Sequence, residues 1–197
     1  MSTATITFKP KQVTKHFLTA LPKRAADVIM KRYGLGTETK KMTLEAIGES
    51  YGITRERVRQ IENFALATIR KSDAFKEEAP VFEELRAVMV AMGGLVPESD
   101  FLEELSGDRA AQNHIHFLLV LGDLFVKHKE DDDFAHRWSV DQETANQVHA
   151  SLKKLYESLE DDQLVEESKM IELFLNHLKD VSEEYKNEEV VKRWLGL

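Results

Sequence analysis

The sequence contains no cysteine, so it can form neither a disulfide bond nor a thiolate metal site. Cysteine-free chains suit a reducing compartment, and we expect a cytoplasmic protein. No stretch reaches the roughly 18 apolar residues of a membrane span. Residues 1–20 hold lysines without a long apolar run. We therefore expect neither a signal peptide nor a membrane partner.

Sequence motifs for catalysis are also lacking. The chain has no GxxxxGK[ST] phosphate loop, no GxGxxG and no nucleophile-elbow pattern. His114 and His116 are two residues apart, which places them on different faces of a helix and suits a core or surface role better than one shared metal. We expect no enzyme, no cofactor and no metal site.

The net charge of −8 is unevenly distributed. Residues 1–72 hold 14 Lys and Arg against 6 Asp and Glu, whereas residues 73–197 hold 13 against 29. The basic first part suits a polyanion such as DNA. The acidic remainder would repel DNA, bind a basic protein surface, or fold back on the basic part.

Residues 42–71 predict two helices joined by a tight turn. Thr43 and Thr54 are expected N-caps, because their hydroxyls can accept from the first free backbone N–H groups. Gly52 suits the left-handed position at the end of the first helix. One apolar face of the second helix, which would pack on the first, is formed by Val58, Ile61, Ala65 and Ile69.

The start of the second helix carries four candidate base-reading residues on its other face: Arg55, Glu56, Arg59 and Gln60. Arginine can donate two hydrogen bonds to guanine, glutamine pairs with adenine, and glutamate accepts from the cytosine amine. Helix-turn-helix proteins place base-reading side chains at this end of the second helix. The alternative is a surface helix whose charges are merely solvated.

The motif TRERVRQIE at 54–62 is followed by Ala65-Leu66. Upstream, the matching residues are Leu21-Pro22, Arg24, Asp27-Val28, Arg32-Tyr33-Gly34-Leu35 and Thr43-Leu44-Glu45-Ala46-Ile47-Gly48. In order and spacing, this segment, about residues 20–72, resembles region 4 of the primary bacterial sigma factors. In sigma factors the segment that melts promoter DNA is aromatic-rich and basic, and we find no such segment here.

The resemblance implies a DNA-binding role for specific residues. The residues expected to read the promoter −35 element in the major groove are Arg55, Glu56, Arg59 and Gln60. Arg57 is expected to contact phosphate, and Thr54 starts the same helix. Lys40 and Lys41 precede the helix-turn-helix within reach of phosphate, although a solvated loop explains them equally well. The family's module also docks on the flap of the RNA polymerase β subunit.

The next part of the chain predicts three helices followed by a hairpin. The expected helices are 81–92, 97–105 and 110–122, and the expected strands are 124–129 and 134–140, joined by the acidic turn 130–133. This pattern resembles the HARE-type winged helix of the polymerase delta subunit. Because the acidic turn would repel phosphate, we expect it to contact protein, with a merely solvated turn as the alternative.

We therefore expect a mainly α fold in three parts. These are a four-helix, helix-turn-helix domain at 1–72, a winged-helix-like α+β domain at 80–140, and an acidic helical C-terminal region at 141–197. Within the last part, helices are expected over 140–159 and 165–178, before an apolar end at Trp194. A boundary between 72 and 80 is indicated by the charged connector and by Pro80.

The expected function is that of a monomeric, DNA-binding transcription initiation factor or regulator. It would read −35-like promoter DNA through the helix 54–71 and contact RNA polymerase. One alternative is a module that occupies the polymerase flap by mimicking region 4 without reading DNA. In another, the acidic part shields the basic part until polymerase is bound.

Overall fold

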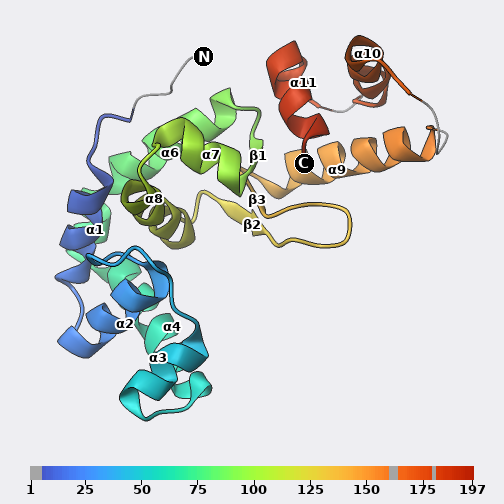
Figure 1. Cartoon of the computed structure of the whole chain (residues 1–197). Coiled ribbons are helices and arrows are strands. Elements are labelled where there is room, and N and C mark those ends of the chain that lie inside the picture. Colours follow the sequence, from blue (N-terminus) through green and yellow to red (C-terminus); the bar gives the residue numbers. More distant parts are fainter. Residues whose placement is uncertain (1–5, 160–163, 179–180) are drawn as a thin grey trace. The chain divides into compact units, whose positions relative to one another are not determined.

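The computed structural model describes residues 6–159, 164–178 and 181–197. Residues 1–5 of the predicted first domain, and 160–163 and 179–180 of the predicted C-terminal region, lie outside this description. The described residues form helices and one three-stranded antiparallel sheet (Figure 1). This confirms the predicted fold class, which is mainly α with a small α+β part.

Contacts divide the chain into two compact units at other positions than the predicted domains 1–72, 80–140 and 141–197. Unit 1 comprises Met1–Leu85 and Leu102–Asp123, and unit 2 comprises Arg86–Phe101 and Leu124–Leu197. Unit 1 takes a later segment because its helix α8 (Arg109–Leu121) packs on α1 (Pro10–Leu18) and α2 (Lys23–Tyr33). Two helices, α6 (Ala79–Ala91) and α7 (Glu98–Leu105), cross the division.

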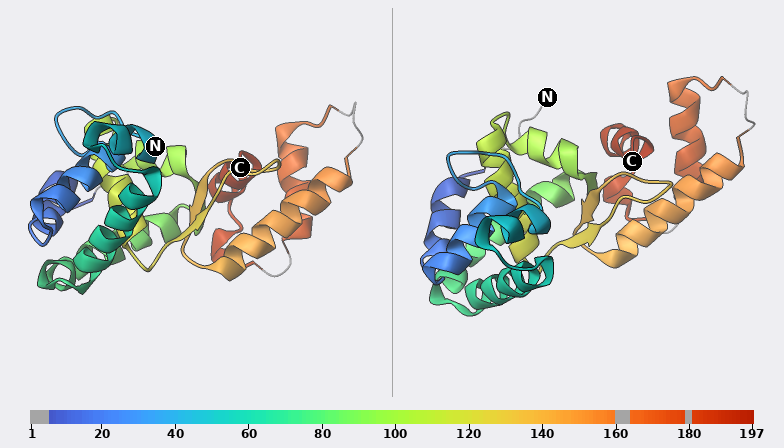
Figure 2. Two further views of the ribbon diagram at one scale, coloured as in Figure 1. Left: turned by 90° about the horizontal axis from the view of Figure 1, so that it is seen from below. Right: turned by 60° about the horizontal axis from the view of Figure 1, so that its bottom comes forward.

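Unit 1 also contains the two helices predicted around the tight turn. These are α3 (Leu44–Tyr51) and α4 (Arg55–Lys71), which lie side by side in Figures 1 and 2. Their shared core is formed by Val28, Ile47 and Val58, all fully buried. The apolar face of α4 therefore packs on α3, as its helical period predicted, and also on α2, which was not predicted.

A short helix, α5 (Asp73–Glu77), follows α4 in the stretch where the sequence predicted a charged connector. Ser72 is extended, so it ends α4, and its hydroxyl accepts from the N–H of Phe75 at 3.2 Å to cap α5. The Phe75 ring lies 5.8 Å from Phe17 and 4.9 Å from Phe82. This aromatic cluster joins α1, α5 and the start of α6, so Pro80 does not mark a boundary of unit 1.

Unit 2 is built on a sheet of order β1-β3-β2, with both pairings antiparallel. Its central residue Trp138 lies opposite Val96 on one side and Lys127 on the other. The order α6-β1-α7-α8-β2-β3 matches the predicted winged-helix pattern, whose family assignment stays a prediction. The remaining elements of unit 2 are β1 (Leu95–Pro97), β2 (Val126–His128), β3 (Arg137–Ser139), α9 (Gln142–Glu157), α10 (Glu167–His177), η1 (Glu183–Tyr185) and α11 (Glu188–Leu195).

Strand β1 was not predicted from the sequence, and the other two strands are shorter than predicted. Pro97, expected to open a helix, ends β1, and α7 starts one residue later. β1 is only three residues long and follows Gly93 and Gly94, both of which have positive φ. Such a short strand has no detectable alternation, and only pairing with β3 defines it.

The C-terminal helix packs back on unit 2. Trp194 of α11 is fully buried, and its indole N–H donates to the Leu95 carbonyl oxygen of β1 at 3.0 Å. The ring meets Phe174 of α10 edge-on, with the ring centroids 6.5 Å apart. The apolar end seen in the sequence is therefore part of the core of unit 2.

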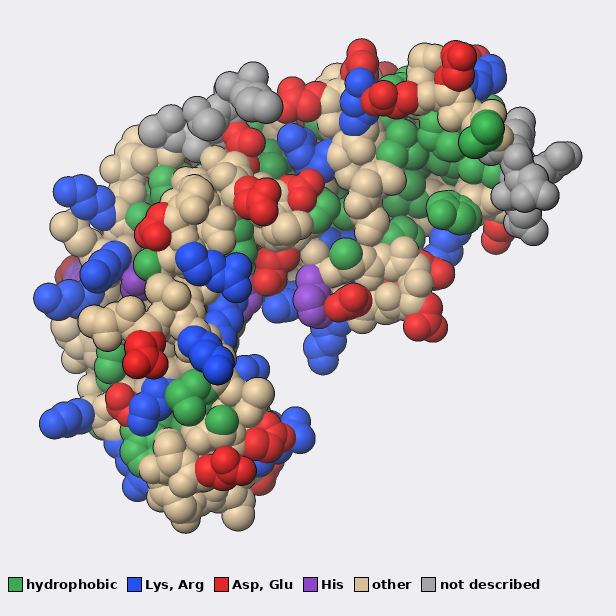
Figure 3. Space-filling model, viewed as in Figure 1, with side chains coloured by type: hydrophobic (Ala, Val, Ile, Leu, Met, Phe, Trp, Pro, Cys, Tyr) green, Lys and Arg blue, Asp and Glu red, His purple; other side chains and the backbone are tan. Residues whose placement is uncertain are grey.

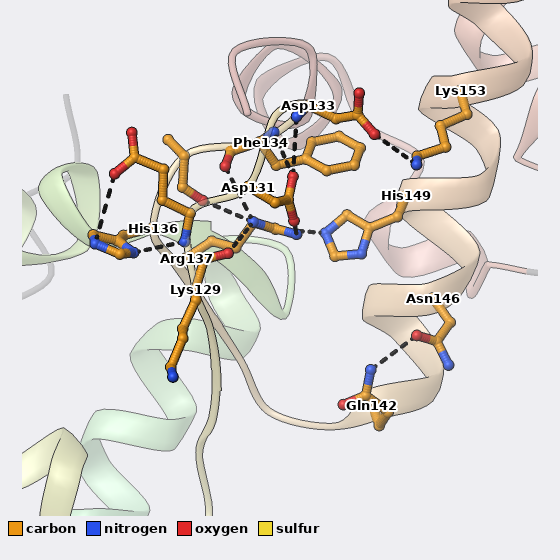
Figure 4. Close-up of polar contacts among 12 residues, drawn as sticks. Lys129, Asp131, Asp133, Phe134, His136, Arg137, Gln142, Asn146, His149 and Lys153 are labelled. Atoms are coloured by element: carbon orange, nitrogen blue, oxygen red, sulfur yellow. Dashed lines mark hydrogen bonds and ion pairs between the residues drawn. The ribbon is translucent and has the colours of Figure 1, made fainter.

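The loop between β2 and β3, residues 129–136, is organised around one buried guanidinium (Figure 4). The Arg137 residue is 4% exposed. Its guanidinium donates to the carbonyl oxygens of Lys129 at 3.1 Å and Ala135 at 2.8 Å. It also donates to Nε2 of His149 at 2.7 Å and to Asp131 at 3.2 Å. A buried charge needs such a complete set of partners, so this loop has a fixed conformation.

This network makes the stability of unit 2 depend on pH. Burial and then the Arg137 charge lower the pKa of His149 to about 4 from 6.5. Between these values the unfolded chain binds more protons, so the stabilisation is complete above pH 6.5 and is lost as the pH falls towards 4. Because the ring is partly solvated, we expect a loss of about 1–2 kcal/mol.

Urea unfolding at pH 7 and pH 4.5 measures this loss. His149→Gln keeps a hydrogen-bond acceptor for Arg137 but cannot titrate. The variant should therefore show a weaker pH dependence than the original chain. An identical pH dependence in the two proteins would contradict the assignment to His149.

Candidate nucleic-acid interface

The turn between α3 and α4 requires two glycines. Gly52 adopts φ +63°, the left-handed conformation that ends α3. The chain then turns so tightly that the Ile53 N–H donates to the Gly48 carbonyl oxygen at 3.0 Å. A Cβ atom on Gly48 would lie 2.6 Å from the carbonyl oxygen of Ile53. The angle between the two helices thus depends on the absence of a Cβ atom at Gly48.

Both predicted N-caps form. The Thr43 hydroxyl accepts from the Ala46 N–H at 3.1 Å, and the Thr54 hydroxyl accepts from the Arg57 N–H at 3.2 Å. Thr54 is exposed, and as a cap its hydroxyl still has its own hydrogen to donate. It sets where α4 begins and hence which side chains occupy the first turn.

The four candidate base-reading residues lie together on the exposed first two turns of α4: Arg55, Glu56, Arg59 and Gln60. Arg59 makes a two-pronged contact with Glu56, at 2.8 Å from Nε and 2.7 Å from Nη2. The side-chain amide of Gln60 donates to Glu56 at 3.4 Å. Arg55 forms an ion pair across the turn with Glu45 of α3 at 3.0 Å. Without DNA, these side chains are held by one another.

The charges of this cluster are stabilised by their neighbours. Hydrogen bonds from Arg59 hold the pKa of the Glu56 carboxyl below its usual value, and the carboxylate raises the pKa of Arg59 in return. Because the pair is exposed, water screens it, and it can be exchanged for contacts to bases at little cost. The arrangement presents donors and acceptors already oriented on one helix face.

The candidate phosphate contacts lie at the edge of this face and in the preceding loop. Arg57 is exposed and donates to the Gln60 side-chain oxygen at 3.0 Å. Lys40 and Lys41 are exposed in the loop between α2 and α3. Their roles in DNA binding stay predictions.

A polar cluster that was not predicted from the sequence braces α2 against α3. The Tyr51 hydroxyl donates to Asp27, and Lys31 forms an ion pair with Asp27 at 2.9 Å. Although burial acts in the opposite direction, hydrogen bonds from Tyr51 and Lys31 lower the pKa of Asp27. The Lys31 ammonium also lies 4.4 Å from the centre of the Tyr51 ring. The i,i+4 spacing of Asp27 and Lys31 was the available sequence signal.

Helix α8 supports the helix-turn-helix from outside the predicted first domain. Asn113 is 2% exposed, and its side-chain amide donates to the carbonyl oxygens of Gly34 at 3.0 Å and Thr39 at 2.7 Å. Arg70 of α4 donates to the carbonyl oxygens of Val120 and Leu121 at 2.9 and 3.0 Å, at the C-terminal end of α8. A guanidinium at this end satisfies orphan carbonyls and complements the helix dipole.

Residues 113–119 of α8 are buried in unit 1, so this part of the helix offers no side chain to a DNA groove. His114 and His116 are 5% and 7% exposed, and burial lowers the pKa of His114. Both histidines are core residues. Within the described residues, no group of three or more His, Asp or Glu side chains is placed to hold a metal ion.

Asn113→Ala should lower the free energy of unfolding of unit 1 by about 1–3 kcal/mol, because one buried and one partly buried carbonyl oxygen lose their donor. Asn63→Ala is the matched control, since Asn63 is exposed on α4 and its loss should change stability by less than about 0.5 kcal/mol. Urea unfolding monitored by circular dichroism measures both. Equal stabilities for the two variants would refute the bracing role of Asn113.

Comparison with known proteins identifies the first part of the chain. Residues 17–71 match the family described as Sigma-70, region 4. This segment is a sigma region 4 helix-turn-helix. The match confirms the predicted resemblance and covers α2, α3 and α4 completely. No solved structure matches the chain significantly.

Three curated relatives are similar to the region 4 segment. The RNA polymerase sigma factor RpoD of Neisseria gonorrhoeae is 44% identical over 59 residues, and the sigma factor RpoS of Coxiella burnetii is 46% identical over 56. The principal sigma factor HrdD of Streptomyces viridifaciens is 43% identical over 51 residues. These alignments cover 30, 28 and 26% of this chain, but only 9, 16 and 15% of the relatives.

All of these matches therefore lie in the region 4 segment. No described helix has the length and apolar character needed to cross a membrane.

Proposed function

We propose that the chain is a DNA-binding transcription factor that reads −35-like promoter DNA through α4. The observation that carries the proposal is the exposed cluster at the start of this helix, formed by Arg55, Glu56, Arg59 and Gln60. Its side chains offer donors and acceptors that match base edges in the major groove. The sigma-factor relatives, which share this segment, support a role in transcription.

Contacts to phosphate would come from Arg57, Lys40 and Lys41, which would fix the position of α4 on the duplex without reading sequence. Neutralising phosphates makes affinity fall as salt rises. The second partner is RNA polymerase, since the relatives are named as RNA polymerase sigma factors. By the resemblance, the β flap is the expected docking site.

Arg59→Ala should weaken binding to a duplex with a −35 element about 5- to 150-fold and change binding to a scrambled duplex far less. The loss arises because the guanidinium can form two hydrogen bonds with one guanine. Arg109→Ala is the matched control: Arg109 is also an exposed arginine near a helix start, but it lies outside the region 4 segment. Fluorescence anisotropy of the full chain measures both.

If Arg59→Ala and Arg109→Ala weakened binding equally on both duplexes, α4 would contribute only charge. The competing proposal, a polymerase-binding module that never reads DNA, would then be preferred. Four base-reading residues on one exposed face favour DNA reading, because flap binding alone does not require them. The tests use the full chain, since a fragment ending near residue 75 would lack α8.

A further inference from the structure

Unit 2 has an open surface groove of about 620 Å³ between the 129–136 loop, α9 and α11. Figure 3 shows apolar side chains exposed over the part of unit 2 where α9, α10 and α11 lie. Tyr156, on the groove wall, is 81% exposed although it is a large aromatic residue. Apolar side chains of the wall are Phe134, Leu152, Tyr156, Trp194, Leu195 and Leu197.

The charged residues of the groove carry a negative balance. Asp132, Asp133 and Glu157 line it together with one cation, Lys153. Lys153 is held by Asp133 at 2.6 Å, as Figure 4 shows. The surrounding chain has the same sign, since residues 124–197 hold 18 Asp and Glu against 10 Lys and Arg. The charges that complement this groove are therefore positive.

The acidic loop beside the groove is already ordered. Arg137 donates hydrogen bonds to this loop. Within the loop, the Asp131 carboxylate accepts from the N–H groups of Asp133 at 3.1 Å and Phe134 at 2.9 Å. The N–H of Ala135 donates to the backbone oxygen of Leu197 at 3.2 Å. A wall that is fixed before binding reduces the entropy lost when a partner docks. A merely solvated turn would need none of these contacts.

We propose that this groove docks a basic amphipathic helix of a partner protein. Apolar side chains of that helix would enter between Phe134, Tyr156 and Leu195, and its Lys or Arg side chains would meet Asp132, Asp133 and Glu157. A helix laid into an apolar groove is a common recognition mode. A second copy of this chain is the alternative occupant: its unit 2 would meet an equally acidic surface, so only its basic region 4 segment could dock.

The first test uses a labelled synthetic peptide and the full chain. The peptide is an amphipathic helix with leucines on one face and lysines along both borders of that face. A shuffled peptide of identical composition keeps the charge but has no apolar face. We expect the shuffled peptide to bind at least about tenfold more weakly in fluorescence anisotropy. Equal affinity would overturn the proposal, because charge alone would then explain binding.

The second test locates the site with matched variants of the full chain. The groove variant combines Asp132→Asn, Asp133→Asn and Glu157→Gln. The control variant combines Glu143→Gln, Glu166→Gln and Glu184→Gln, which change the charge equally but lie outside the groove lining. We expect the groove variant to weaken peptide binding about tenfold and the control less than about twofold. Equal losses would overturn the proposal.

Tyr156→Ser tests the apolar wall separately and should also weaken peptide binding, since this exposed side chain is not needed for folding. Circular dichroism checks that each variant is folded. Light scattering tests whether a second copy of the chain occupies the groove instead. Self-association that Tyr156→Ser abolishes would overturn the proposal in favour of a second copy. A chain that stays monomeric and binds the peptide at Tyr156 supports it. None of these measurements involves DNA, so they are independent of the proposed function.

Discussion

Trp194→Ala should lower the free energy of unfolding of unit 2 by about 3–5 kcal/mol. The indole is fully buried, and its N–H donates to the Leu95 carbonyl oxygen at 3.0 Å. Its ring also contacts Phe174 and Tyr185 edge-on, at centroid distances of 6.5 and 6.1 Å. Alanine would leave a large cavity and an unpaired carbonyl oxygen. Urea unfolding followed by the fluorescence of Trp138 measures the loss.

Tyr156→Ala is the control for this large effect, because Tyr156 is an aromatic residue of the same unit that is 81% exposed. Its replacement should change the free energy of unfolding by less than about 0.5 kcal/mol. If Trp194→Ala were as mild as the control, α11 would not be part of the core of unit 2. The groove that α11 borders would then lose its support as well.

Gly48→Ala should destabilise the region 4 segment by about 2–3 kcal/mol and abolish discrimination between duplexes. The added Cβ would lie 2.6 Å from the Ile53 carbonyl oxygen, a backbone atom that cannot move without opening the turn. Elsewhere in a helix, Gly to Ala stabilises by about 0.5–1 kcal/mol, so the expected sign is reversed here. Thermal unfolding and duplex binding measure the two effects.

Gly36→Ala provides the comparison at a glycine with open surroundings. Nothing lies within 4 Å of a Cβ built on Gly36, so its replacement should leave stability and DNA binding nearly unchanged. A stabilising effect of Gly48→Ala would show that the turn between α3 and α4 is looser than the structure has it. The placement of α4 for base reading would then lose its physical basis.

The local features of region 4 could be predicted from the sequence. Thr43, Gly52 and Thr54 act within three residues of their partners, so the sequence contains nearly all the information on caps and turn. The exposed face of α4 follows from its helical period in the same way.

The long-range features could not be predicted. Asn113 binds carbonyl oxygens more than 70 residues earlier, and Trp194 binds one 99 residues earlier, so no local pattern announces either contact. Likewise, β1 exists only because β3 pairs with it. The order of the acidic turn could not be predicted either, because Arg137 lies inside the expected strand 134–140 and nothing in the sequence marks it as the residue that binds the turn.

Base reading by α4 is tested most directly by fluorescence anisotropy of a duplex carrying a −35 element against a scrambled duplex. The full chain is titrated across a salt series, with and without core RNA polymerase. If α4 reads bases, the chain binds the −35 duplex more tightly and keeps this preference as salt rises, while its affinity for the scrambled duplex falls. A preference that appears only with polymerase would show that the factor acts when tethered. Equal affinity for both duplexes under every condition would contradict base reading by α4.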